Sequence, residues 1–298
     1  MRVLIYGLSK SGTTFLAAIV KASLERRLGK ASGEVFEPKA LSEEGGELCY
    51  LDKGGNCMAV STDTEVVKTL FDSGVPPEQV LEHQKYFDKK IFITRDPRDR
   101  LLSHLFYRWN ASHSPDPERF SRVLRLTLHK EKHPRDLPVS FLLHQNPGAF
   151  QGVPYRMKAA YRAVTEFVDA AGDDWLIFRY EDLVDGNLSR LEEYLGMPVA
   201  TNVSVSSGLK RVVRTKAHGN WRRWFTAEDV QFFRPIFKPY MESMGYDFED
   251  WELEECESLP GEQGSQYMLK MFSAPASQGV ARQLVRLFRK CGEKLGLG

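Results

Sequence analysis

Short runs of consecutive apolar residues mark several strands, because a strand that is covered on both faces shows no polar alternation. The clearest runs are residues 2–6, 90–94 and 175–179, and residues 57–60 form a weaker fourth candidate. Between them, apolar residues recur at helical spacing over residues 13–27, 101–109 and 158–171. Strands that alternate with helices predict an α/β fold with a central, mainly parallel sheet flanked by helices.

The polar segments indicate how the chain is divided. Residues 110–154 are rich in His and Arg, so we expect an acceptor-binding or lid insertion with one helix over about 119–129. From 256 to 277 the composition shifts to Gly, Ser, Glu and Gln, which is typical of a linker, and an amphipathic helix over 279–295 follows. These segments predict a main domain over 1–250 and a linker with a C-terminal helix over 251–298.

Composition narrows the class of protein. The 298 residues include 41 Lys+Arg and 40 Asp+Glu, so a net charge of +1 gives no support to nucleic-acid binding. The sequence contains no run of about 18 apolar residues, so no membrane-spanning helix is predicted. The four cysteines form no C-x-x-C pair, and the apolar start is too short for a signal peptide. We therefore expect reduced thiols and a cytoplasmic protein.

The first predicted strand leads directly into a loop of glycine and hydroxyl residues, Gly7-Leu-Ser-Lys-Ser-Gly-Thr-Thr14, and then into a helix. Such a loop presents several N–H groups at the positive end of the helix, an arrangement that binds phosphate. The pattern G-x-x-x-x-G-K-[ST] is met except that Thr13 stands at the lysine position, and the lysine lies in the loop as Lys10. This pattern predicts a phosphate site, and a tight strand–helix turn is the plain alternative.

Two later segments carry clustered cations. The second predicted strand ends at Arg95, after which Asp96 can cap a helix, Pro97 suits its first position and Ser103 follows about two turns later. Residues 211–226 combine arginines, one glycine and three aromatic residues, a composition that suits an anion-binding loop over a nucleotide. A solvated helix start and a protein interface are the alternatives for these two segments.

Taken together, these segments resemble the sulfotransferase family that uses 3′-phosphoadenosine-5′-phosphosulfate (PAPS). The loop Lys10-Ser-Gly-Thr-Thr-Phe15 is similar to the family's 5′-phosphosulfate loop, and Arg95 with Ser103 matches its 3′-phosphate motif. The triplet Tyr180-Glu-Asp resembles a strand end whose tyrosine lies near adenine. The resemblance covers roughly residues 2–247, including a C-terminal cofactor loop matched by Gly219, Trp221, Phe225 and Thr226.

The resemblance implies which residues bind the cofactor. These are Lys10, Ser11, Gly12, Thr13, Thr14, Phe15, Arg95, Ser103, Tyr180, Arg214, Thr215 and Lys216. The family's usual Arg-Lys-Gly is Arg214-Thr-Lys216 in this chain, so the arginine alone is carried over directly. Lys10 would cover the leaving phosphate oxygen, and Ser103 would restrain Lys10 until acceptor arrives. No metal is implied, because the lysine covers the leaving oxygen and the sequence shows no Cys/His ligand cluster.

The general base is open between three residues. Cytosolic small-molecule members supply a histidine from a Lys-Thr-His strand end, but the one histidine between residues 45 and 91 is His83, in a polar segment that is typical of a surface helix. Residues 33–38 instead resemble the glutamate-bearing segment of carbohydrate and protein-tyrosine sulfotransferases. We expect Glu37 to be the base, held extended by Pro38, with Glu34 as the second candidate and His83 as the third.

The resemblance therefore implies an enzyme that transfers the sulfuryl group of PAPS to a hydroxyl or amine of an acceptor. Basic residues of the 110–154 insertion suggest a glycan or another hydroxyl compound as acceptor. One alternative is a P-loop small-molecule kinase that uses ATP. Another is a non-catalytic nucleotide-binding protein that a basic amphipathic helix over 280–295 recruits to a membrane surface.

Overall fold

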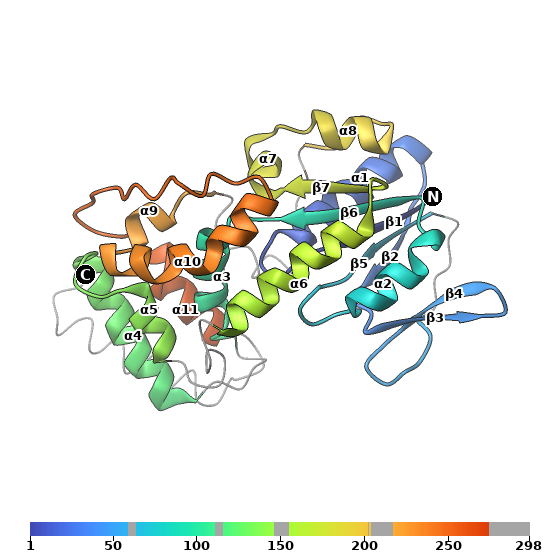
Figure 1. Ribbon diagram of the computed structural model, residues 1–298. Helices are drawn as coiled ribbons and strands as arrows, with labels where there is room; N and C mark the ends of the chain where they lie inside the picture. The colour runs from blue at the N-terminus through green and yellow to red at the C-terminus, as the bar shows by residue number, and fades with distance from the viewer. Residues whose placement is uncertain (59–63, 111–115, 146–154, 202, 204–216, 274–298) are drawn as a thin grey trace. The chain divides into compact units, whose positions relative to one another are not determined.

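The computed structural model describes residues 1–58, 64–110, 116–145, 155–201, 203 and 217–273 (Figure 1). The chain forms two compact units. The first comprises residues 1–100, 157–207 and 237–247, and the second comprises residues 101–156, 208–236 and 248–298. Two helices contribute residues to both units, namely α3 (Pro97–Tyr107) and α10 (Ala227–Ser243). The predicted division at residue 250 stays a prediction.

The first unit is built around a five-stranded sheet in the order β2-β5-β1-β6-β7, in which every neighbouring pair is parallel. The strands are β1 (Arg2–Tyr6), β2 (Gly33–Phe36), β5 (Glu65–Lys68), β6 (Lys89–Thr94) and β7 (Trp175–Arg179). The α/β fold and the three clearest strands are thus confirmed. Because all five strands run in one direction, their carboxyl ends share one edge, where open α/β sheets bind ligands.

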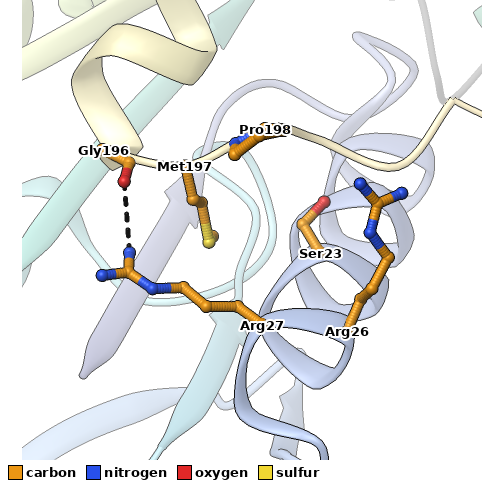
Figure 2. Close-up of a pocket in the computed structure, with 6 residues that line it drawn as sticks. All are labelled: Ser23, Arg26, Arg27, Gly196, Met197 and Pro198. Atoms are coloured by element: carbon orange, nitrogen blue, oxygen red, sulfur yellow. Dashed lines mark hydrogen bonds between the residues drawn. The ribbon is translucent and has the colours of Figure 1, made fainter.

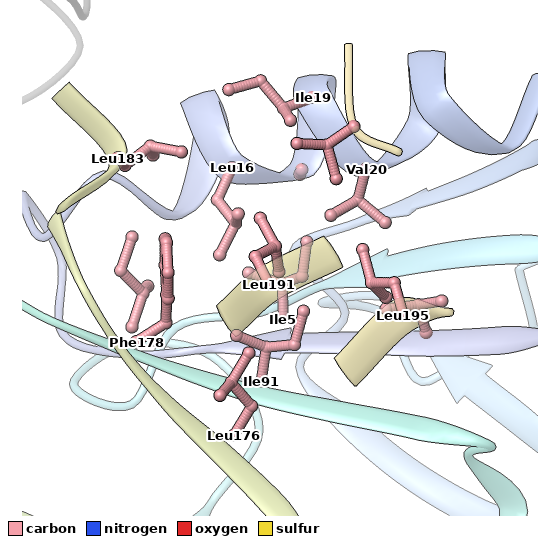
Figure 3. Packing of buried hydrophobic residues seen from close by; sticks show 14 of the residues in the cluster. Ile5, Leu16, Ile19, Val20, Ile91, Leu176, Phe178, Leu183, Leu191 and Leu195 are labelled. Atoms are coloured by element: carbon pink, nitrogen blue, oxygen red, sulfur yellow. The ribbon is translucent and has the colours of Figure 1, made fainter. Parts of the chain in front are cut away.

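Helices cover both faces of this sheet. One face is buried under α1 (Thr13–Leu28), α7 (Tyr180–Asp185) and α8 (Ser189–Leu195). Figure 3 shows Leu16 of α1 and Leu191 of α8 packed with Ile5 and Ile91 of the strands. On the other face, Phe167 of α6 (Tyr155–Ala171) packs edge-on against Tyr6, with ring centroids 5.2 Å apart. Since Ile5 and Tyr6 point to opposite faces, coverage on both sides explains the continuous apolar runs.

The segment between β2 and β6 differs from the sequence-based expectation. It holds an antiparallel hairpin of β3 (Ala40–Glu44) and β4 (Glu47–Leu51), then β5, α2 (Pro77–His83) and the short helix η1 (Gln84–Tyr86). Of the fourth strand predicted at 57–60, only Cys57 and Met58 are described, and they belong to no strand; β5 is the strand that pairs with β1 on this side. Residues 59–63 lie outside the described part of the chain.

A disulfide closes the hairpin region. Cys57 pairs with Leu51 in an isolated bridge and is bonded to Cys49. The expectation of four reduced thiols is therefore wrong for this pair, whose proximity depends on the hairpin and has no C-x-x-C signal. Cys256 is a free thiol, and Cys291 lies outside the described residues.

The second unit is helical. Besides parts of α3 and α10, it contains α4 (Pro117–Lys132), α5 (Val139–His144), α9 (Trp221–Trp224), η4 (Gly261–Gln263) and α11 (Ser265–Phe272). The helix predicted over about 119–129 is confirmed as α4, and α5 is a second helix of the same insertion. In the described part of the chain, no helix is both long enough and apolar enough to cross a membrane.

The linker predicted over 256–277 is wrong for α11, which packs against α4. The rings of Phe120 and Phe272 stack with centroids 3.9 Å apart. Glu131 accepts a hydrogen bond from the N–H of Ser265 at 2.6 Å, at the start of α11, and burial raises the pKa of this carboxyl. The amphipathic helix predicted over 279–295 lies outside the described residues.

Candidate active site

The loop after β1 folds as a turn that can enclose a phosphate. Ser11 N–H donates to the carbonyl of Leu8 at 3.1 Å, and Gly12 is left-handed (φ 94°) just before α1. A Cβ at Gly12 would lie 2.4 Å from the ring of Tyr180, too close for any side chain. Gly12 is therefore needed both for the backbone conformation and for the contact with Tyr180.

Two features of this loop fit a bound anion. Gly12 provides no side-chain cap, so the first N–H groups of α1 can point at a ligand. The hydroxyl oxygen of Ser11 is buried and has no hydrogen-bond partner among the described residues, which is uncommon for a buried polar group. Phosphate oxygens bound in the loop would accept hydrogen bonds from the N–H groups of α1 and from the Ser11 hydroxyl. These residues therefore fit the 5′ end of PAPS.

The other loop residues are buried or partly buried. Lys10 has a φ of 69°, a left-handed conformation that is uncommon for a residue with a side chain. Thr13 and Thr14 begin α1 as predicted, and Thr13 is buried. Phe15 is partly buried against the hydrophobic core of the first unit, so its contribution in the structure is packing.

Arg95 connects the arginine motif to this loop. It follows β6 directly, it is buried, and its Nη1 donates to the carbonyl of Lys10 at 3.0 Å. Its guanidinium also lies over the ring of Tyr180, 4.2 Å from the centroid. Tyr180 therefore lies against both anion-binding motifs, while its predicted place near adenine stays a prediction.

A second carboxylate, which the sequence analysis missed, fixes the turn after β6. Asp96 accepts from the N–H of Arg98 at 2.8 Å and so caps α3, as predicted. Glu181 accepts from the N–H of Asp96 at 2.9 Å and from the hydroxyl of Tyr246 at 3.0 Å, and burial raises the pKa of Glu181. The available signal is the Tyr-Glu-Asp triplet after β7, of which the resemblance assigns only the tyrosine.

Four predicted cofactor residues are not placed at this site. Ser103 is buried in the part of α3 that belongs to the second unit. Arg214, Thr215 and Lys216 lie outside the described residues. Their roles toward the cofactor stay predictions.

Glu37 lies at the carboxyl edge of the sheet, directly after β2. Its N–H donates to the carbonyl of Lys68 at 2.7 Å, and its carboxylate forms an ion pair with Lys68 Nζ. Lys68 ends β5 and is almost completely buried, and burial lowers the pKa of its ammonium group. The expectation that Pro38 holds Glu37 extended is wrong, because the φ of Glu37 is 53°. Two bonds to Lys68 hold Glu37 in a conformation that the local sequence disfavours.

The other two base candidates lie elsewhere in the first unit. Glu34 is the exposed second residue of β2. His83 ends α2, shortly before β6 begins, so it belongs to the amino edge of the sheet, and it is buried rather than exposed. Its Nδ1 donates to the carbonyl of Gln79 at 2.9 Å. The end of β5 continues as Lys68-Thr69-Leu70, so a leucine stands where a Lys-Thr-His strand end carries its histidine.

A cleft at the far end of α1 is separate from this site. It has a volume of about 320 Å³ and is lined by Ser23, Arg26, Arg27, Gly196, Met197 and Pro198 (Figure 2). The 16 residues of α1 span about 24 Å at 1.5 Å per residue, and the loop with Lys10 precedes the opposite end. Nowhere in the described part of the chain do three or more His, Cys, Asp or Glu side chains gather into a possible metal site.

Three comparisons with known proteins bear on this arrangement. Mouse sulfotransferase SULT7A1 complexed with PAP is 16% identical, with a TM-score of 0.49 over 80% of this chain and 84% of that chain. Retinol dehydratase in complex with androsterone and the inactive cofactor PAP is 16% identical, with a TM-score of 0.44 over 81% of this chain and 80% of that chain. At these values the solved structures say nothing of this chain's reaction.

A search of curated proteins found no match. A family model described as a sulfotransferase domain matches residues 1–207. This range holds the loop with Lys10, the carboxyl edge with Glu37 and Arg95, and Tyr180. More than half of the chain thus matches one family, along the strands and loops that form the site, and the chain belongs to the sulfotransferase family.

Proposed function

We propose that the chain transfers the sulfuryl group of PAPS to a hydroxyl or amine of an acceptor, with Glu37 as general base. One observation supports this most directly. Among the described residues, Lys10 and Glu37 are the only non-glycine residues with a left-handed φ, and both follow strands at the carboxyl edge. Strained backbone of this kind concentrates at functional sites. One strand, β5, lies between β1 and β2, so these two strands run about 10 Å apart at the edge where both residues follow.

The phosphate-binding residues divide into two groups. The N–H groups of the loop, Thr13, Thr14 and Lys10 would bind the 5′ side, where charge grows on the bridging oxygen as the bond to sulfur breaks. An ammonium group aimed at that oxygen stabilises the transition state more than the ground state. Arg95, with Ser103 and Arg214, would hold the 3′-phosphate through charge-assisted hydrogen bonds.

Glu37 would take the proton of the acceptor. As the acceptor oxygen or nitrogen forms its bond to sulfur, the sulfur–oxygen bond to the 5′-phosphate breaks, and the acceptor proton moves to the Glu37 carboxylate. The ion pair with Lys68 orients this carboxylate. Its side chain is 31% exposed, so an acceptor can reach it.

The acceptor that we propose is a glycan or another hydroxyl compound. The basic composition of the 110–154 insertion supports this, because cationic side chains suit an acceptor that carries negative charge. The resemblance of residues 33–38 to the glutamate segment of carbohydrate and protein-type members supports a closer relation to these members than to histidine-base members. We also propose peripheral membrane contact through residues 280–295 and a cytoplasmic location.

Transfer of a ³⁵S label from PAPS to a panel of glycans, lipids and phenols tests this function. In parallel, adenosine 3′,5′-bisphosphate without magnesium should stabilise the protein, by about 2.7 kcal/mol at 100 times its Kd. For a chain of this size the melting temperature would rise by about 5 °C. Stabilisation by ATP with Mg²⁺, but not by the bisphosphate, would instead support a P-loop kinase.

A further inference from the structure

Both backbone polar groups of Ser9, the residue before Lys10, are held by side chains from other elements. The N–H of Ser9 donates to Asp72 Oδ1 at 3.0 Å, and its hydroxyl donates to Asp72 Oδ2 at 2.5 Å. The carbonyl of Ser9 accepts from Arg100 Nε at 2.9 Å. Asp72 lies in none of the phosphate-binding motifs of the sequence, and Arg100 lies within the segment 95–103 but is not among its predicted phosphate-binding residues.

The two side chains also bind each other. Arg100 Nη2 lies 3.1 Å from Asp72 Oδ2, and Arg100 Nη1 donates to the hydroxyl of Tyr161 on α6 at 3.3 Å. The side chain of Arg100 is 12% exposed and that of Asp72 is 27% exposed, so solvent screens the pair only in part. The guanidinium uses three of its nitrogen atoms in three directions, which a lysine cannot reproduce.

These contacts determine the backbone of Lys10. The carbonyl of Ser9 and the N–H of Lys10 share one planar peptide group, and Arg100 fixes that plane. The carbonyl of Lys10 lies in the next peptide plane, which Arg95 fixes through its bond at 3.0 Å. With both flanking planes held, Lys10 keeps its left-handed φ of 69°, although this conformation is disfavoured for a residue with a side chain.

We propose that Asp72 and Arg100 are positioning residues that set the direction of the Lys10 side chain toward the leaving oxygen. This proposal rests on the proposed function. Asp72 itself is not a base, because both of its carboxylate oxygens already accept hydrogen bonds from Ser9. We call the bonds of Asp72 and Arg100 to Ser9 the clamp. Loss of the clamp would let Lys10 relax to an ordinary backbone conformation, and its ammonium group would then miss the bridging oxygen.

Asp72→Asn and Arg100→Lys test the proposal, each as the full chain. Asn places a donor where Asp72 accepts, and Lys loses the guanidinium fork. For both variants we expect kcat to fall about 10- to 100-fold, because a misplaced cation acts on the transition state. The Kd of adenosine 3′,5′-bisphosphate should change less than threefold, because Arg95 still holds the 3′-phosphate. The double variant should be no slower than the slower single variant, because both changes break one network.

Glu65→Gln is the matched control. Glu65 forms a similarly short ion pair with Arg2, at 2.8 Å, but at the amino edge of the sheet. This variant should lose melting temperature without losing kcat, which separates a stability effect from positioning. A kcat of Asp72→Asn that falls no further than that of Glu65→Gln would overturn the clamp.

Hydrogen exchange of the peptide over residues 7–12 is a readout that needs no activity. The peptide should exchange faster in Asp72→Asn than in the wild type and in Glu65→Gln. If the wild type transfers no sulfuryl group but the exchange difference is present, the proposed function fails while the clamp stands. If the wild type is active and neither exchange nor kcat responds to Asp72→Asn, the clamp fails while the function stands.

Discussion

Replacing Glu37 by Gln removes the proposed proton acceptor and keeps the size of the side chain. We expect transfer to slow about 10²–10⁴-fold, the range that a positioned general base contributes. The Kd of adenosine 3′,5′-bisphosphate should barely change, because the loop with Lys10 and the guanidinium of Arg95 do not depend on this carboxylate. The same substitution also removes the counter-charge of Lys68, so its effect on stability has to be known.

The structure sets the size of that stability effect. Lys68 is buried, and breaking a buried ion pair costs about 3–5 kcal/mol. Because 31% of the Glu37 side chain is exposed, solvent screening reduces the expected loss to about 1–3 kcal/mol. For a chain of this size that corresponds to a melting temperature lower by about 2–5 °C.

The loss of stability in Glu37→Gln should depend on pH. Burial already holds the pKa of Lys68 below its ordinary value of 10.5, and without Glu37 it falls further. Between the folded and the unfolded pKa, the unfolded state binds more protons, so the free energy of unfolding rises with pH. Glu37→Gln should therefore regain stability relative to the wild type as the pH is raised toward 10.5. Thermal melts at a series of pH values measure this.

The double variant Glu37→Gln/Lys68→Met separates the two roles of Glu37. An apolar side chain of similar length in place of Lys68 should restore most of the melting temperature, whereas transfer should stay slow because no base is present. Turnover near the wild-type rate in Glu37→Gln would refute the base assignment. If Glu34→Gln or His83→Gln abolishes transfer instead, that residue is the base.

Four other substitutions have distinct expected outcomes. Lys10→Met should lower kcat with little change in bisphosphate affinity. Arg95→Ala should weaken the bisphosphate affinity at least 10-fold, measured by calorimetry. If Arg95→Ala binds the bisphosphate as tightly as the wild type does, Arg95 does not belong to the site. Tyr246→Phe loses its hydrogen bond to Glu181 and should lower the free energy of unfolding by about 1 kcal/mol in denaturant titrations. Burial lowers the pKa of Lys130 to about 8 from 10.5, so between pH 8 and 10.5 the wild type should gain about 1.4 kcal/mol per pH unit relative to Lys130→Met, and parallel pH dependences would contradict this.

The sequence predicts best the strands whose residues are apolar throughout. β1, β6 and β7 were foreseeable because helices cover both of their faces, and the loop after β1 follows from glycine and hydroxyl spacing. β5 was missed because it begins with Glu65 and ends with Lys68, which are both buried. Each is paired with a residue distant in sequence, Arg2 and Glu37 respectively, and such pairing leaves no local pattern.

Local preferences also fail where tertiary bonds oppose them. Proline after Glu37 favours extended backbone, yet the bonds to Lys68 hold the residue left-handed. In α11, glycine and polar neighbours suggest a linker, although Tyr267, Met268, Met271 and Phe272 are buried. Asp72 was missed for a related reason: its role depends on three chain segments that meet only in the folded sheet.

The hairpin of β3 and β4 can change in length at its tip without displacing Glu37. It begins just after Glu37, and its ends are tied together because Lys39 N–H donates to the carbonyl of Leu51 at 2.7 Å. Its tip, Gly45–Gly46, is exposed at the far end of the strand pair. Residues inserted at this tip would lengthen the hairpin outward without moving Glu37. Natural variation or a grafted segment at this position would therefore leave the base in its place.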